Sequence, residues 1–228
     1  MDDNKSFTYK IIETEEEAKS AFFLYADVHL SHNPYYLELL KNSDYNFNKE
    51  IFFNYHVHNT NKILKDKLSC IAVDNSNNKV VAFICAEELF SEPNPEMPQE
   101  KPLFIRLGKD IYQKSLERFI KEEKLKFEKG VYLGLSKITT HYEYHRRGLS
   151  YNLFKFVEKI GKERGFEYVY IDPAHDTVQK LVLGKLEYPE IGRLDYDDIE
   201  FEGKFPYKGL CQDFQSKPQI IYCLKKLD

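Results

Sequence analysis

The spacing of apolar residues along the chain switches between a period of two and a period of about 3.6, which predicts alternating strands and helices. Residues 7–12 read as a first strand. The next apolar residues recur at helical spacing, and they are Ala18, Ala21, Phe22 and Tyr25. An amphipathic helix is therefore predicted to about His29, with a capping box formed by Thr14 and Glu17 at its start.

Helical and extended segments continue in alternation to the end of the chain. Asn33 and Pro34 break the first helix, because the residue before a proline avoids the helical conformation. A second helical region is predicted over residues 35–65, interrupted near 42–46. The later predicted elements are a β-hairpin over 68–73 and 79–90, a helix over 104–127, a strand over 130–140, a helix over 149–164 that stops at Gly165, a strand over 167–171, a short helix over 177–186, and closing strands over 199–205 and 219–227. This order predicts a mixed α/β fold.

Proline is concentrated in residues 91–102, which contain Pro93, Pro95, Pro98 and Pro102. Proline fixes φ and lacks an amide donor, so this stretch is neither a helix nor a central strand. Neither half of the chain reads as a complete fold by itself. We therefore expect a long surface loop inside a single domain over residues 1–228, rather than a boundary between two domains.

Composition and charge argue against several classes of function. With 33 Lys and Arg against 37 Asp and Glu, the net charge is −4, which disfavours general nucleic-acid binding. No apolar run approaches the roughly 20 residues that span a bilayer, and the N-terminus lacks a signal-peptide core, so we expect a cytoplasmic protein without a membrane partner. The 4 cysteines form no C-x-x-C pair, which predicts reduced thiols, mostly in strands, and no metal site.

One segment carries most of the chemical information, and it reads Thr139-Thr140-His141-Tyr142-Glu143-Tyr144-His145-Arg146-Arg147-Gly148-Leu149-Ser150. It lies between a predicted strand and the start of a helix, where free amides and the helix dipole favour an anion. Gly148 lets the backbone approach a ligand, and Arg146 and Arg147 add positive charge. The segment predicts a pyrophosphate cradle. The alternative is a basic loop that precedes an ordinary helix.

This segment resembles the motif of the GCN5-related N-acetyltransferase (GNAT) superfamily, roughly Val-His-Pro-x-Tyr-Arg-x-x-Gly-x-Gly/Ala. The residues in register are Thr140, His141, Tyr144 and Gly148. The resemblance continues through the helix over 149–164 and the strand after it, and residues 185–188 (Lys-Leu-Glu-Tyr) stand where the family has Lys-Leu-Gly-Phe. The chain looks most like the arylalkylamine N-acetyltransferase-like branch, because of the long helix before the fourth strand, Pro34 after the first helix and the closing segment over 196–205.

The resemblance implies a GNAT fold, with a single mixed, mostly antiparallel sheet flanked by helices. It implies an acyl-CoA-dependent N-acyltransferase in which a primary amine, from a small molecule or a protein, attacks the thioester of acetyl-CoA directly. Such a reaction relies on positioning and on an amide donor at the developing oxyanion. The residues that would bind the coenzyme are Ile138, Thr139, Thr140, His145, Arg146, Arg147, Gly148, Leu149, Ser150 and Thr177.

Some positions depart from the family's pattern. His145 stands where the loop usually has Arg or Gln, and Ser150 stands where it has Gly or Ala. Asn33 replaces the glutamate that serves as the base in the resembled branch, and Leu183 replaces a tyrosine that many members carry. A base is still needed, because an ammonium is not a nucleophile. The candidates are His32, Glu38 and, on the preceding helix, Asp27.

Several singled-out residues have a structural alternative to a functional role. His32 is either a base or a structural residue, and Tyr188 is expected to pack like the family's phenylalanine. Thr177 and Gln179 either contact the coenzyme or cap a short helix. His56 and His58 point to different faces of a helix, which argues against a metal pair. The acidic residues Asp197, Asp198, Glu200 and Glu202 either attract a cationic amine or form a solvated surface.

Two functions follow from these residues. The first is N-acyl transfer to an arylalkylamine, an alkylamine, a polyamine or a protein amine. The second is a catalytically impaired GNAT-fold protein that acts as a binding or structural subunit; Asn33 and Leu183 favour this alternative, and the loop around Gly148 opposes it. A P-loop nucleotide-binding protein is disfavoured, since no G-x-x-x-x-G-K-[ST] segment is present. The acceptor and the oligomeric state stay open.

Overall fold

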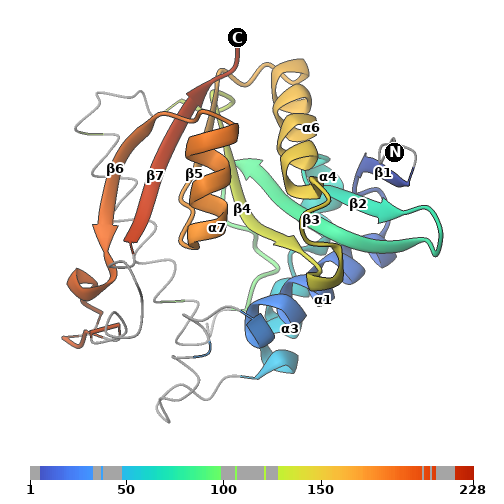
Figure 1. Ribbon diagram of the computed structural model, residues 1–228, viewed down its shortest axis with the longest axis horizontal. Coiled ribbons are helices and arrows are strands. Elements are labelled where there is room, and N and C mark those ends of the chain that lie inside the picture. Colours follow the sequence, from blue (N-terminus) through green and yellow to red (C-terminus); the bar gives the residue numbers. More distant parts are fainter. Residues whose placement is uncertain are drawn as a thin grey trace.

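A seven-stranded sheet runs through the molecule in the order β1-β2-β3-β4-β5-β7-β6 (Figure 1). The computed structural model describes residues 6–32, 37, 48–98, 106, 121, 128–201, 203–205, 207–208 and 219–228. The strands are β1 (Phe7–Ile11), β2 (Cys70–Asp74), β3 (Lys79–Glu88), β4 (Tyr132–Thr140), β5 (Tyr168–Ile171), β6 (Glu190–Asp195) and β7 (Gln219–Lys226). Within this part of the chain, neighbouring strands pair antiparallel except β4 and β5, which are parallel. The predicted mixed, mostly antiparallel sheet is confirmed.

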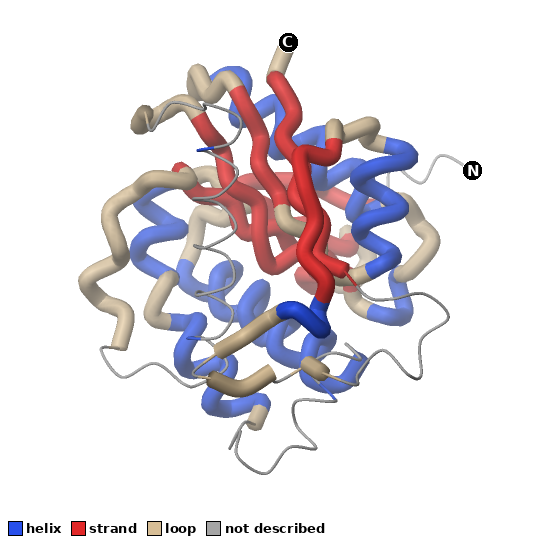
Figure 2. Tube along the Cα trace, turned by 90° about the vertical axis from the view of Figure 1, so that its left-hand side faces the viewer, coloured by secondary structure: helices blue, strands red, loops and turns tan. Residues whose placement is uncertain are grey.

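Helices cover both faces of the sheet (Figure 2). They are α1 (Glu15–His32), α3 (Lys49–Val57), α4 (Thr60–Asp66), α6 (Leu149–Glu163) and α7 (Asp176–Lys180), the last continuing into a π-helical turn over Leu181–Lys185. Successive side chains of a strand point to opposite faces, and β3 shows which helices lie on which face. Phe83 and Cys85 pack with α1, α3 and α4, whereas Ala82 and Ile84 pack with α6. No helix among the described residues is long and apolar enough to cross a bilayer.

The predicted helix signals act as expected. The Glu17 amide donates to the Thr14 hydroxyl at 3.2 Å, and the Glu17 carboxylate accepts from the Glu13 amide at 2.9 Å, so the capping box is confirmed. Gly165 ends α6 with a φ of +85°, a left-handed conformation that favours glycine. Cys70, Cys85 and Cys223 are buried thiols within strands, as predicted.

Some predicted elements are wrong. The closing strand expected over residues 199–205 is instead β6, further upstream, and only an isolated bridge between Phe201 and Lys204 forms in that region. Ile199 and Tyr196 are buried there in a turn, so their apolar character reports packing rather than a strand. The second helical region breaks after α3 at residues 58–59. The helix predicted over 104–127, apart from the helical Arg106 and Lys121, lies outside the described residues.

We expect Leu153→Ala to lower the free energy of unfolding by about 2–5 kcal/mol, because it leaves a cavity in the α6 face of the core. Leu153 is fully buried, whereas Leu183 is 38% exposed and provides a matched control. Urea unfolding followed by circular dichroism should therefore show a small change for Leu183→Ala. Equal losses in the two variants would contradict the packing of α6 described above.

Candidate functional site

The sheet opens between β4 and β5. The two strands pair from Tyr132 with Tyr168 to Leu135 with Ile171, and β4 then continues to Thr140 with β3 as its neighbour. Figure 1 shows β4 running on toward α1, away from the end of β5. The backbone of this second half of β4 therefore has one edge that pairs with no described strand. Such an edge offers amide donors and carbonyl acceptors to a ligand.

A β-bulge lies in the same half of β4. Phe83 pairs with Thr139 and Cys85 pairs with Ser136, so β4 holds one residue more than β3 over this interval. Lys137, within the bulge, has a φ of +52°, which is rare for a residue with a side chain. Bulges of this kind redirect a side chain and interrupt regular pairing. Here the bulge coincides with the point where β4 leaves β5.

The loop that follows β4 is anchored to its surroundings by hydrogen bonds. The His141 amide donates to the Val81 carbonyl at 2.9 Å, and a ring nitrogen of His145 lies 3.1 Å from the Thr140 carbonyl. The Tyr144 hydroxyl donates at 2.8 Å to Asp74, the last residue of β2, just before the turn to β3. Hydrogen bonds from the Ser76 hydroxyl and amide and from Tyr144 lower the pKa of Asp74, so the carboxylate stays ionised and holds the loop.

The loop leads into the N-terminus of α6, which is open to an anion. Gly148 has a φ of +75° and supplies no side-chain cap, so the first amides of α6 keep their donors. A Cβ added at Gly148 would meet no atom within 4 Å, which indicates free space in front of this terminus. Arg146 and Arg147 are exposed beside it, and the Arg147 guanidinium lies 5.0 Å from the centre of the Tyr144 ring. The residues present therefore fit the pyrophosphate of a coenzyme.

The predicted coenzyme residues fall into two groups. Most lie along one path, from the free half of β4 (Ile138, Thr139, Thr140) through the loop (His145, Arg146, Arg147, Gly148) to the first turn of α6 (Leu149, Ser150). The hydroxyls of Thr140 and Ser150 lie 2.8 Å apart and link the two ends of this path. The Leu149 side chain is buried in the core, so only its backbone can contribute. The contact of these residues with a coenzyme stays a prediction.

Thr177 is on a separate element, the first turn of α7. Its amide is 3.2 Å from Nδ1 of His175, which is the residue that caps α7. Gln179 instead donates to the carbonyls of Pro173 and Gln219, the second at 2.5 Å. The capping alternative for Thr177 and Gln179 is therefore wrong, because His175 does that work and Gln179 links α7 to β7.

Of the predicted bases, His32 and Asp27 lie within the described residues, both on α1. His32 is exposed at the end of α1, with its ring 5.0 Å from that of Tyr142 in the loop. Glu38 and Asn33 lie outside the described residues. Asp27 is bonded to Lys49 at 2.5 Å and so already has a cationic partner. Tyr188 is buried against Phe154, as predicted, and none of the described residues forms a hydrogen bond of normal geometry with its hydroxyl.

Asp172 is a carboxylate that the sequence reasoning missed. It follows Ile171, the last β5 residue paired with β4, and so borders the opening between the strands. Burial raises the pKa of Asp172 to about 7, although its own amide and the charge of Lys137 act in the opposite direction. A carboxyl group that titrates near neutral pH beside the end of a strand pairing is a candidate base. The sequence gives only a weak indication of a functional role for Asp172, because a single Asp before a proline, here Pro173, is also typical of a turn.

Several histidines lie near the same opening and are neutral. Burial lowers the pKa of His29 on α1 to about 3, with His175 and Lys137 adding to the effect. His56 on α3 is buried among the rings of Phe22 and Phe52, and burial lowers the pKa of this imidazole well below its usual value. His58 is exposed, so the two histidines of the candidate metal pair do not converge. No cluster of metal ligands occurs among the described residues.

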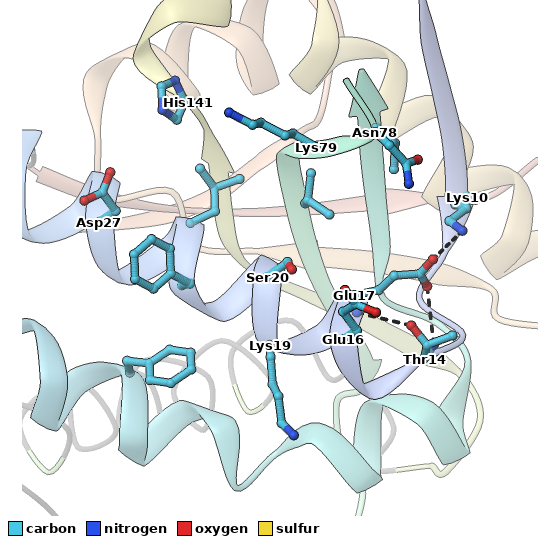
Figure 3. A pocket seen from close by; sticks show the side chains of 15 residues that line it. Lys10, Thr14, Glu16, Glu17, Lys19, Ser20, Asp27, Asn78, Lys79 and His141 are labelled. Carbon is cyan, nitrogen blue, oxygen red and sulfur yellow. Dashed lines mark hydrogen bonds and ion pairs between the residues drawn. The ribbon is translucent and has the colours of Figure 1, made fainter. Parts of the chain in front are cut away.

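A separate groove of about 750 Å³ lies beside α1 at the β1 end of the sheet (Figure 3). His141 is the residue that it shares with the loop described above. Its charged side chains are mostly paired, since Glu17 bonds Lys10, Glu15 bonds Lys19 at 3.1 Å, and Asp27 bonds Lys49. The described residues that line the groove form no convergent set of reactive groups, so the opening between β4 and β5 is the better candidate site.

Known structures share this fold. The sequence matches no family model and no curated protein. The C-terminal condensation domain of Ebony in complex with β-alanyl-dopamine superposes with a TM-score of 0.78 and 12% identity, covering 96% of this chain and 98% of that chain. The mosquito protein arylalkylamine N-acetyltransferase like 5b superposes with a TM-score of 0.69 and 15% identity, covering 97% of this chain and 100% of that chain. The putative acetyltransferase yncA from Salmonella typhimurium, solved with its cofactor acetyl-CoA, superposes with a TM-score of 0.54 and 8% identity, covering 98% of this chain and 95% of that chain.

The chain has the GNAT fold. At these identities the likeness concerns the fold, and the expectation from residues 130–188 is confirmed at that level. In this GNAT fold, the loop with Gly148 and the free half of β4 are continuous, as the geometry above requires.

We expect Asp172→Asn to become progressively more stabilising, relative to the native protein, as pH rises from 4 to 7. The folded-state pKa of Asp172 is about 7, above the usual value of 3.8, so between these values the folded protein binds more protons than the unfolded chain. This group therefore stabilises the fold less as pH rises, by at most about 1.4 kcal/mol per pH unit. Urea unfolding of both proteins at several pH values measures the difference. A difference independent of pH would show that Asp172 is not perturbed.

Proposed function

We propose that this protein is an acyl-CoA-dependent N-acyltransferase that transfers an acetyl group to a primary amine. The observation that carries the proposal is the continuous path from the free half of β4, past the bulge, to the uncapped N-terminus of α6. A pantetheine arm is a chain of amides with a pyrophosphate at one end, and this path offers backbone hydrogen bonds followed by an anion site. All residues of the site belong, in this proposal, to one domain over 1–228.

The residues of the chain have separate roles in the proposed reaction. Acetyl-CoA supplies the activated acyl group. Gly148 and Ser150 hold the pyrophosphate through the amides of α6, while Arg146 and Arg147 add charge that attracts it from solvent. Backbone amides near Ile138 position the thioester and stabilise the oxyanion that develops on it. The rate then depends mostly on the orientation of the amine against the thioester.

Asp172 is the base in this proposal. It borders the strand opening, and a pKa of about 7 allows it to be ionised and still to hold a proton near neutral pH. His32 and Glu38 remain the alternatives. His32 lies beside Tyr142, in the loop that follows β4. The leaving thiolate is protonated by water, since Leu183 cannot donate and burial raises the pKa of Tyr188 above its usual range.

The acceptor class follows from chemistry and from the related folds. The mosquito neighbour is named for arylalkylamines, and the Ebony domain is bound to an amide of an aromatic amine. These names support a primary amine as the acceptor and leave open an acyl group other than acetyl. The competing function is a non-catalytic subunit, which the replaced tyrosine at Leu183 favours.

We expect saturating acetyl-CoA to raise the melting temperature of the native protein, since a ligand at ~100 times Kd adds ~2.7 kcal/mol of stability. Gly148→Glu should abolish the shift, because it puts a negative side chain where the pyrophosphate would bind. Gly165→Glu is the matched control: Gly165 has a similar φ of +85°, open space for a Cβ, and a place at the other end of α6. Calorimetric titration with CoA gives the affinities. An unchanged affinity in Gly148→Glu, or no binding to the native protein, would defeat the proposal.

The rate of acetyl transfer should rise with pH through an apparent pKa near 7, as Asp172 loses its proton. Asp172→Asn should lower kcat by about 10²- to 10⁴-fold and leave the affinity for CoA unchanged. His32→Gln and Glu38→Gln serve as comparisons and should retain the native profile. A loss confined to His32→Gln or to Glu38→Gln would assign the base to that residue instead.

A further inference from the structure

Lys137 is a cation placed inside the candidate site without a carboxylate partner. It lies in the β4 bulge, partly buried, with a left-handed φ of +52°. Its ammonium group donates to the Ser136 hydroxyl at 3.3 Å and lies 3.8 Å from the Cys85 sulfur. Within the described part of the chain, no carboxylate is within ion-pairing distance of it. Removing a charge from water without pairing it to an opposite charge costs free energy. An unpaired lysine in this place therefore suggests a binding partner that the chain itself does not supply.

The groups around Lys137 leave a net positive charge. Glu87 of β3 is already paired with Lys62 of α4, at 3.3 Å. His29 and His56, which face it from α1 and α3, are neutral because burial lowers the pKa of each imidazole. Tyr55 on α3 is uncharged at neutral pH, since burial raises the pKa of its phenol.

The remaining neighbours keep the lysine charged. Asp172, at the end of β5, is close enough for Lys137 to oppose the rise in its pKa, but no ion pair joins them. Burial acts against the charge of Lys137, but the nearby Glu87 carboxylate and the hydrogen bond to Cys85 favour it, and the pKa of the ammonium is above its usual value. At neutral pH, therefore, a cation with no carboxylate partner among the described residues lies beside the free half of β4.

Lys137 lies on the face of the sheet from which the acceptor amine, rather than the coenzyme, would approach. Cys85, which it contacts, packs on the α1 and α3 face of the sheet. The N-terminus that would hold the pyrophosphate belongs to α6, on the opposite face. A coenzyme bound along α6 would bring its thioester to the opening, and the amine would then approach from the face where Lys137 lies.

We propose that Lys137 binds a carboxylate of the acceptor, so that the substrates are amines that carry a carboxylate, such as amino acids. This inference rests on the proposed function and narrows it. The ammonium of Lys137 repels a second ammonium group, which disfavours diamines and polyamines. It forms a charge-assisted hydrogen bond with a carboxylate, one of the stronger interactions available in a partly buried site.

Matched acceptor pairs test the proposal. Tyrosine is compared with tyramine, phenylalanine with phenethylamine, and β-alanine with propylamine, with release of CoA thiol as the readout and rates normalised to the free-amine fraction. We expect kcat/KM to favour the carboxylate member of at least one pair by about 10- to 100-fold. Lys137→Met should remove this preference and Lys137→Arg should keep part of it. Lys79→Met, an exposed lysine of β3, is the control that should leave it unchanged.

Binding measurements keep the inference separate from the proposed function. Calorimetric titration of 3-phenylpropionate, 3-(4-hydroxyphenyl)propionate and propionate into the CoA-loaded protein, and into the free protein, reports carboxylate recognition without any turnover. We expect at least one acid to bind the native protein at least ~10-fold more tightly than Lys137→Met. Failure to bind CoA would defeat the proposed function, and equal acid binding by the two proteins would overturn the role of Lys137. A Lys137→Met effect only on the choice between acetyl-CoA and malonyl-CoA would also overturn it, because the carboxylate recognised would then belong to the acyl group.

Discussion

The arrangement of the molecule depends on the point at which β4 stops pairing with β5. A strand inside a sheet normally satisfies its backbone donors and acceptors on both edges. Beyond the pair of Leu135 with Ile171, β4 pairs among the described strands with β3 alone, along one edge. The other edge pairs with no described strand, and two titratable groups with shifted pKa values come from the strands that border it. Lys137 comes from the strand that leaves, and Asp172 from the end of the strand that stops.

The loop that precedes α6 is held in place by contacts remote from it. Arg146 and Gly148 both have positive φ values, +63° and +75°, so the loop before α6 departs from ordinary backbone geometry. Left-handed conformations at non-glycine residues persist where the surroundings determine them. The bond from Tyr144 to Asp74 and the contact of His145 with the Thr140 carbonyl are these surroundings. The end of an early strand therefore helps to orient a loop that lies far along the chain.

Much of the fold was predictable from local patterns, because the strongest signals are chemical and short-range. The capping box at Thr14, the stop at Gly165 and the apolar face of α6 were each readable in a few residues. The loop around Gly148 was predictable for the same reason. β6 was not, since an edge strand with few apolar residues resembles a turn, and the apolar Tyr196 and Ile199 that pack beside it resemble a strand. Lys137 and Asp172 gained their significance from the divergence of two strands that are distant in sequence, which no local pattern reports.

The central pairing of the sheet has a consequence for the order of folding. Strands β1 to β3 precede the proline-rich stretch and β4 to β7 follow it, and β3 and β4 join the two groups, with Ala82 opposite Thr140. Contacts between residues so distant in sequence form late, because closing the intervening chain costs entropy before the pairing can compensate for it. The bulge at Lys137 is the extra residue that β4 holds where it pairs with β3. It therefore forms only when strands β1 to β3 pair with strands β4 to β7. The opening between β4 and β5 and the bulge beside it are then among the last features to assemble.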